Sequence, residues 1–166
     1  MSHEKFEALF MQNADLVRRY IARRHVGDDV DDLAAEVFTI AWQRFSTIPA
    51  GHELPWLYRT AWNVLANAHR KVLPLLSDEQ VDSPESDVAD VVIASDRLLA
   101  CWQSLSPRDR ELLRLAAWEG LSGRDLAATL GISEGGASAA LSRARTALRL
   151  AWEQYGNEGS DEWNQG

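Results

Sequence analysis

Arginine and hydroxyl side chains recur at helical spacing near the C-terminal end of the chain. At 100° per residue the outer face of a helix there carries Ser138, Ser142, Arg145, Thr146 and Arg149, with Arg143 at its edge. Guanidinium groups bind phosphate oxygens, whereas short hydroxyls make few bidentate contacts to bases. The face therefore predicts a DNA-binding surface that relies mostly on phosphates. The alternative is a solvated face of an ordinary helical hairpin.

A second polar face lies within residues 56–71 and combines guanidinium, amide and indole groups. Its stripe contains Arg59, Asn63, Asn67 and Arg70, with Trp56 in the stripe and Trp62 at its border. Aromatic rings stack on unpaired bases, amides bind base edges, and arginines hold phosphates. This combination predicts a site for single-stranded nucleic acid. In the alternative, the two tryptophans pack against neighbouring helices as core.

A third face, on the preceding helix, is polar and acidic. It presents Asp32, Glu36, Thr39 and Gln43 on one side. Any soluble helix has such a face, and charge alone would make it a solvated one. Its role depends on the rest of the chain.

Two capped helices joined by a short turn must position the C-terminal arginine face. Ser122 and Ser133 suit the N-caps of the two helices, and Gly131 lies between them, where a left-handed helix end favours glycine. The inner faces are apolar, with Leu126, Ala127 and Leu130 on the first helix and Ala137, Ala140, Leu141, Ala144 and Leu148 on the second. This arrangement predicts a helix-turn-helix motif.

Two amphipathic helices position the other faces. Apolar residues at three- and four-residue steps predict a core-facing stripe of Val30, Leu33, Ala34, Val37, Phe38, Ala41, Trp42 and Phe45. The next helix has Pro55 in its first turn and groups Leu57, Ala61, Val64, Leu65 and Ala68 on its apolar side. Because no segment alternates apolar and polar residues as a strand would, we predict an all-α chain.

Charge and composition divide this all-α chain into two small helical domains. The net charge of −8 is concentrated in residues 72–95 and 153–166, which hold 6 and 4 acidic side chains and no basic ones. We expect a domain over 1–72, an acidic flexible linker over 73–95, a second domain over 96–152 and an acidic tail over 153–166, in which residues 156–166 resemble the linker in composition. Neither domain is strongly basic, which predicts weak DNA affinity for the isolated protein.

Composition also excludes several classes of protein. No apolar run approaches the length of a membrane span, and the N-terminus lacks the features of a signal peptide, so we expect a cytoplasmic protein without membrane insertion. Cys101 is the only cysteine, and we expect it to be a small buried apolar residue. The four histidines show no ligand spacing, so we expect no metal and no cofactor. No catalytic constellation appears, which argues against an enzyme.

Three segments in order resemble an extracytoplasmic-function (ECF) sigma factor of bacterial RNA polymerase. They are DDVDDLAAEVFTIAWQRF, PWLYRTAWNVLANAHRK and, after the linker, LSPRDRELLRLAAWEGLSGRDLAATLGISEGGASAALSRARTALR. The resemblance spans residues 6–150 and implies a σ2 bundle followed by a σ4 helix-turn-helix. It further implies a promoter-specificity subunit without catalytic residues, whose partners are core polymerase, promoter DNA and an anti-sigma factor of unknown identity.

The resemblance assigns a role to each polar face. Asp32, Glu36, Thr39 and Gln43 would bind the clamp helices of the largest polymerase subunit. The melted minus-ten element would contact Arg59, Trp62, Asn63, Asn67, Arg70 and Lys71. The minus-thirty-five element would contact Ser138, Ser142, Arg143, Arg145 and Arg149. Gly135 and Gly136, each costing a helix about 1 kcal/mol relative to alanine, would loosen the first turn of the recognition helix.

Two other functions account for part of the sequence. A single-motif transcription regulator would explain the C-terminal helices but leaves the tryptophan and asparagine face of residues 56–70 unused. A polymerase-binding adaptor would keep the fold and the docking face without productive promoter contact, as the weak recognition helix permits.

Overall fold

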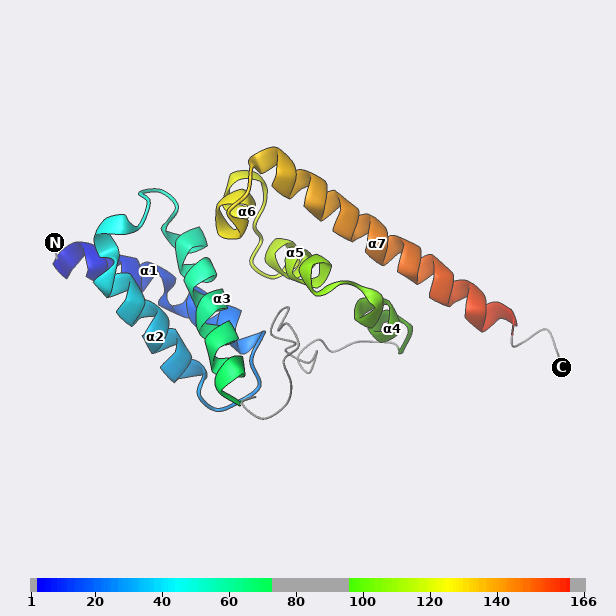
Figure 1. The fold of residues 1–166 in the computed structure, drawn as a ribbon, viewed down its shortest axis with the longest axis horizontal. Coiled ribbons are helices and arrows are strands. Elements are labelled where there is room, and N and C mark those ends of the chain that lie inside the picture. Colours follow the sequence, from blue (N-terminus) through cyan, green and yellow to red (C-terminus); the bar gives the residue numbers. More distant parts are fainter. Residues whose placement is uncertain (1–2, 73–95, 162–166) are drawn as a thin grey trace. The chain divides into compact units, whose positions relative to one another are not determined.

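The computed structural model describes residues 3–72 and 96–161, which form seven α-helices and one 3-10 turn, with no strand among them (Figure 1). The helices are α1 (His3–Ala22), α2 (Val30–Gln43), α3 (Glu53–Val72), α4 (Asp96–Ser104), α5 (Pro107–Ala117), α6 (Gly123–Leu130) and α7 (Glu134–Asp161), with the 3-10 turn η1 (Phe45–Thr47) after α2. The predicted all-α class is confirmed. The predicted linker, 73–95, lies outside the described residues. None of the described helices is long and apolar enough to cross a membrane.

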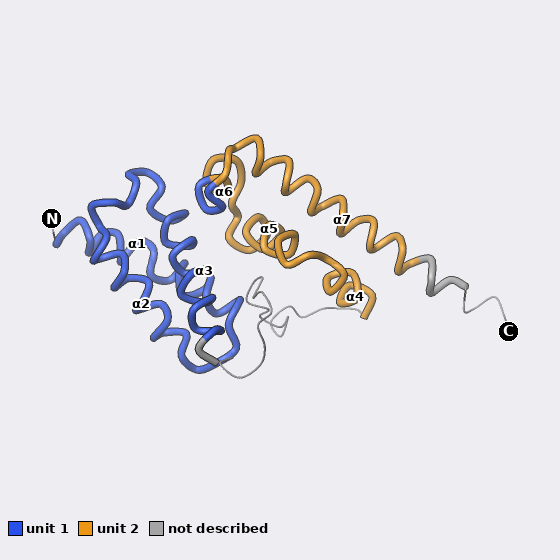
Figure 2. The backbone as a smooth tube through the Cα atoms, in the orientation of Figure 1, with its two compact units in different colours: residues 1–90, 128–131 blue, residues 91–127, 132–166 orange. Residues whose placement is uncertain are grey.

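The chain divides into two compact units (Figure 2). The first unit comprises residues 1–90 and 128–131, and the second comprises residues 91–127 and 132–166. Each unit buries its own set of apolar side chains, as expected for two small domains.

The first unit is a bundle in which α1, α2 and α3 each pack against the other two. The expected core residues Leu33, Val37, Phe38 and Ala41 of α2 are buried, as are Leu57, Ala61, Val64 and Leu65 of α3. Tyr58 adds a contact absent from the predicted stripe, because its ring stacks on that of Tyr20 with centroids 4.9 Å apart. Burial of these faces turns the opposite sides of α2 and α3 outward.

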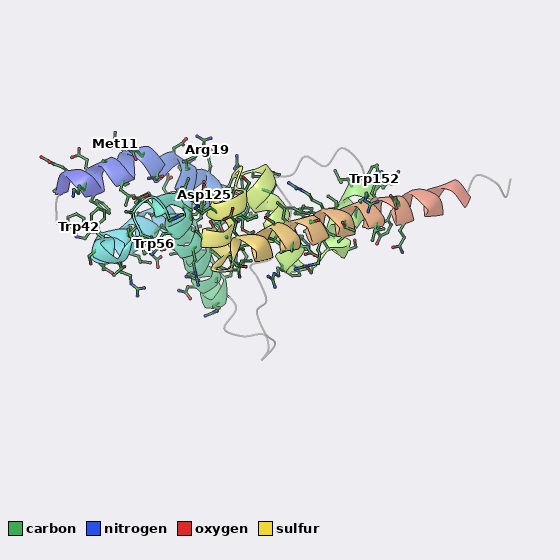
Figure 3. The ribbon with its side chains drawn as sticks, turned by 90° about the horizontal axis from the view of Figure 1, so that it is seen from above. Met11, Arg19, Trp42, Trp56, Asp125 and Trp152 are labelled. Atoms are coloured by element: carbon green, nitrogen blue, oxygen red, sulfur yellow. The ribbon has the colours of Figure 1, made fainter. Side chains whose placement is uncertain are left out.

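Trp42 corrects the predicted core stripe of α2. Its side chain is 39% exposed. It lies at the C-terminal end of α2, beside the first turns of α1 (Figure 3). The ring of Phe6 packs edge-on against it at 4.9 Å and that of His3 at 6.1 Å. Trp42 is therefore a boundary residue. Val30, Ala34 and Phe45 of the stripe, and Ala68 of α3, are half-buried.

In the second unit, α4 and α5 pack against α7. The Ser106 Oγ accepts a hydrogen bond from the Asp109 backbone N–H at 3.1 Å, with Pro107 at the first helical position, so α5 begins at a well-formed N-cap. Cys101 is fully buried, as predicted.

The turn between α6 and α7 has the predicted features. Gly131 has φ +68°, and the Ile132 N–H donates to the Ala127 carbonyl at 3.1 Å, which closes the end of α6. The Ser133 Oγ accepts from the Gly136 N–H at 3.0 Å and so caps α7. The first turn of α7 is helical although it contains two consecutive glycines.

The C-terminal tail differs from the linker-like segment expected from its composition, because α7 continues to Asp161. Arg97 of α4 contacts this part of α7. Its guanidinium lies 3.7 Å from the centroid of the Trp152 ring and donates a hydrogen bond to the Trp152 carbonyl. The same group occupies the space that a side chain at Gly156 would fill. A tertiary contact thus supports helix in a stretch with weak intrinsic propensity.

Candidate nucleic-acid and protein interfaces

The polar face of α3 is open to solvent along its length. Arg59, Asn63, Asn67 and Arg70 are all exposed, because α1 and α2 cover the opposite side of the helix. The backbone of Lys71 belongs to α3, but its side chain lies outside the described residues. The structure therefore leaves the amide and guanidinium groups of this stripe accessible to a ligand.

Both tryptophans of this helix are half-buried, between the two alternatives that the sequence left open. Trp56 lies in the first turns of α3 (Figure 3), where its carbonyl accepts a hydrogen bond from the Thr60 hydroxyl at 2.9 Å. Trp62 borders the stripe near Asn63. Each residue is thus neither fully buried nor fully exposed, which leaves stacking on a base feasible.

The acidic face of α2 is also exposed. Asp32, Glu36, Thr39 and Gln43 lie on the side away from α1 and α3. Within the described ranges, neither Asp32 nor Glu36 forms an ion pair, whereas their neighbour Asp31 binds Arg18 at 2.7 Å. The Thr39 hydroxyl donates to the Ala35 carbonyl at 2.9 Å, which leaves its oxygen free to accept. Unpaired carboxylates of this kind suit a basic protein surface.

The outer face of α7 carries the predicted hydroxyls and arginines. Ser138, Ser142, Arg143, Arg145 and Arg149 are exposed. Arg149 also lies 3.7 Å from the Glu153 carboxylate one turn later, which offsets part of its charge. A Cβ at Gly135 would meet no atom within 4 Å, so the first turn of α7 presents a nearly bare backbone.

One cluster in the first unit was not predicted from the sequence, in which the histidines show no metal-ligand spacing. His25, in the loop 23–29 between α1 and α2, stacks on His69 near the end of α3 with ring centroids 5.6 Å apart. The His25 Nδ1 lies 3.5 Å from the His69 Nε2, and the His25 Nε2 lies 2.6 Å from the Asp29 Oδ1. The hydrogen bond from His25 lowers the pKa of Asp29, and burial, followed by the nearby His25, lowers the pKa of His69.

Comparison with known proteins matches two parts of the chain to known regions. Residues 9–72 match the family model "Sigma-70 region 2", and residues 95–148 match "Sigma-70, region 4". The ECF RNA polymerase sigma factor SigL of Mycobacterium tuberculosis is 31% identical over 159 residues, covering 90% of this chain and 89% of SigL. The chain belongs to the ECF sigma factors.

Further proteins are similar to this chain in sequence or in fold. The sigma factor CarQ of Myxococcus xanthus is 32% identical over 155 residues, covering 89% of each chain. The fold of this sigma factor is similar to that of RpoE from Bartonella quintana, solved with the anti-sigma factor NepR, at TM-score 0.59 and 19% identity, covering 90% of this chain and 98% of that one. CnrH, solved with the cytosolic domain of CnrY, is similar in fold with the same TM-score of 0.59, at 21% identity, covering 92% of this chain and 90% of CnrH.

The matched regions include nearly all of the candidate residues of this sigma factor. The region 2 match contains the exposed faces of α2 and α3, and the region 4 match contains the motif of α6 and α7 through residue 148. Arg149 and the remainder of α7 follow the region 4 match.

Proposed function

We propose that this ECF sigma factor binds core RNA polymerase through the acidic face of α2 and directs initiation through two DNA-binding surfaces. One observation carries this proposal. The same bundle presents carboxylates without ion-pair partners on α2 and an exposed face of amide, guanidinium and indole groups on α3. A regulator built on the second unit alone would have no use for either face.

The face of α3 has the chemistry to hold a melted strand. Asn63 can hydrogen-bond the edge of an unpaired base, Arg59 and Arg70 can bind the flanking phosphates, and the open parts of Trp56 and Trp62 can stack on bases. This is the surface that we assign to the minus-ten element, with Asn67 and Lys71 completing the set.

The face of α7 has the chemistry to hold a duplex with modest base specificity. Its arginines can bind phosphates, and its serines are too short for bidentate contacts across the major groove. We therefore assign Arg143, Arg145 and Arg149, with Ser138 and Ser142, to the minus-thirty-five element, read mainly through its backbone.

The proposed function includes no catalytic step and places the chain in the cytoplasm with the polymerase. We also propose regulation by an anti-sigma factor, since RpoE, a solved sigma factor of similar fold, is in complex with the anti-sigma factor NepR.

Run-off transcription tests the proposal. Purified protein and core polymerase, with genomic fragments as templates, should yield transcripts from discrete start sites that core polymerase alone does not produce. Core binding without specific initiation would favour the adaptor, and DNA binding without core binding would favour the regulator.

Replacing arginines of α7 should weaken initiation without changing base preference. Arg143→Ala or Arg145→Ala should reduce initiation by a similar factor on every minus-thirty-five variant, because phosphate contacts carry no sequence information. Each substitution should also lower the salt slope of promoter binding by about 1. Base changes in this element should each cost less than the ~1 to 3 kcal/mol of a well-read base pair.

The matched control is Arg108→Ala, which removes an exposed arginine from α5. Initiation measured across a panel of promoter variants distinguishes the outcomes. Relaxed preference at a single base pair in one α7 variant would show that this arginine reads a base.

A further inference from the structure

The stacked histidine pair joins two segments far apart in the sequence. His25 belongs to the loop 23–29 and its side chain is only 11% exposed, while His69 is half-buried three residues before the end of α3. Their facing nitrogens lie 3.5 Å apart. The pair therefore connects the C-terminal end of α3 with the loop between α1 and α2.

The geometry restricts how many protons the pair can hold. The His25 Nε2, 2.6 Å from the Asp29 carboxylate, is placed as a donor. One proton can then lie between the His25 Nδ1 and the His69 Nε2, donated by either ring. When both rings are fully protonated, two N–H groups meet across 3.5 Å and two cations lie side by side, which is repulsive.

Other charged side chains belong to the elements that carry the pair. Arg23, Arg24, Asp28 and Asp29 belong to the same loop, with Asp29 at the N-cap position of α2, and Arg70 follows His69 on α3. Arginine and aspartate side chains do not ordinarily titrate between about pH 5 and 8, whereas histidine does.

We propose that the His25 and His69 pair is a pH-sensitive contact, which holds the end of α3 against the loop 23–29 when at most one ring is charged and releases it when both are. Asn67 and Arg70 lie on the segment that would be released. The proposal concerns the protein alone and does not depend on the promoter or polymerase roles assigned above.

The direction of the pH dependence follows from the proton affinities. Burial and the neighbouring His25 lower the pKa of His69 from its ordinary value of 6.5, so the unfolded or released state binds the proton more tightly. Stability from this contact is then fully present above about pH 6.5 and is lost as the pH falls through the lower pKa of the folded state. The pKa of Asp29 is lowered from its ordinary value of 3.8, so its effect on stability falls in a separate pH range, below 3.8.

Hydrogen exchange of the full chain tests the proposal. Amide protection in residues 64–72, corrected for the intrinsic pH dependence of exchange, should fall between pH 7.5 and pH 5.5, while protection in α5 should not. In His69→Gln, which keeps a polar side chain but cannot be protonated, protection should not depend on pH. The matched control His3→Gln removes an exposed histidine outside the pair and should behave like the unmodified protein.

Two results would overturn the proposal: equal protection of residues 64–72 at both pH values, or the same loss in His69→Gln as in the unmodified chain. If His69→Gln does not fold, an NMR titration of the imidazole C2–H of His69 in the unmodified protein decides. Its midpoint should lie below 6.5 and coincide with the loss of protection, and a midpoint at or above that value would contradict the contact.

Discussion

Reversing both charges on the acidic face of α2 is expected to abolish most of the binding to core polymerase. Asp32 and Glu36 are exposed and form no ion pair within the part of the chain that the structure describes, so their charge is available to a partner. In Asp32→Lys/Glu36→Lys, a basic surface would meet two cations in place of two anions. We expect a loss of about 2 kcal/mol or more, equivalent to about thirtyfold weaker binding.

Quantitative core binding and thermal unfolding should be measured together. Asp32 lies in the first turn of α2, where a lysine opposes the helix dipole at a cost of about 0.3 to 1 kcal/mol, so a small drop in melting temperature is expected. Glu4→Lys/Glu7→Lys makes the same charge change on exposed positions of α1 and serves as the control. Unchanged core affinity in the α2 variant would contradict the docking assignment.

Replacing Asn63 with alanine is expected to impair formation of the open complex. Its amide is exposed in the centre of the α3 stripe, between Arg59 and Asn67, so truncation removes a hydrogen-bonding group without opening a cavity. Loss of one base contact should cost about 1 to 3 kcal/mol, a reduction of about 5- to 150-fold in open complexes. Permanganate footprinting of a duplex promoter measures the melted region directly.

A premelted template separates strand opening from strand binding. On this template, initiation by Asn63→Ala should improve only by the part of its defect that arises from strand opening. The contact with the unpaired base is still missing, so the rest of the defect should remain. Gln12→Ala, which truncates an exposed amide on α1, should open the promoter normally. Normal permanganate reactivity in Asn63→Ala would remove this residue from the minus-ten role.

Features set by local sequence were predictable from the chain alone. The exposed faces of α2, α3 and α7 follow from a period of 3.6 residues, since burying one apolar stripe turns the opposite stripe to solvent. Gly131 and Ser133 mark the turn between α6 and α7 because left-handed helix ends and N-caps have strong residue preferences. In the same way, the period indicated which side of α3 could meet a ligand.

Contacts between distant segments needed the tertiary structure. The partial exposure of Trp42 depends on where α1 begins relative to the end of α2, and the ordered end of α7 depends on Arg97 reaching Trp152 from another helix. His25 and His69 lie 44 residues apart, and no local pattern indicates that their rings stack. Helical period determines which face of each helix is buried, whereas the packing of whole helices decides which residues meet at their ends and edges.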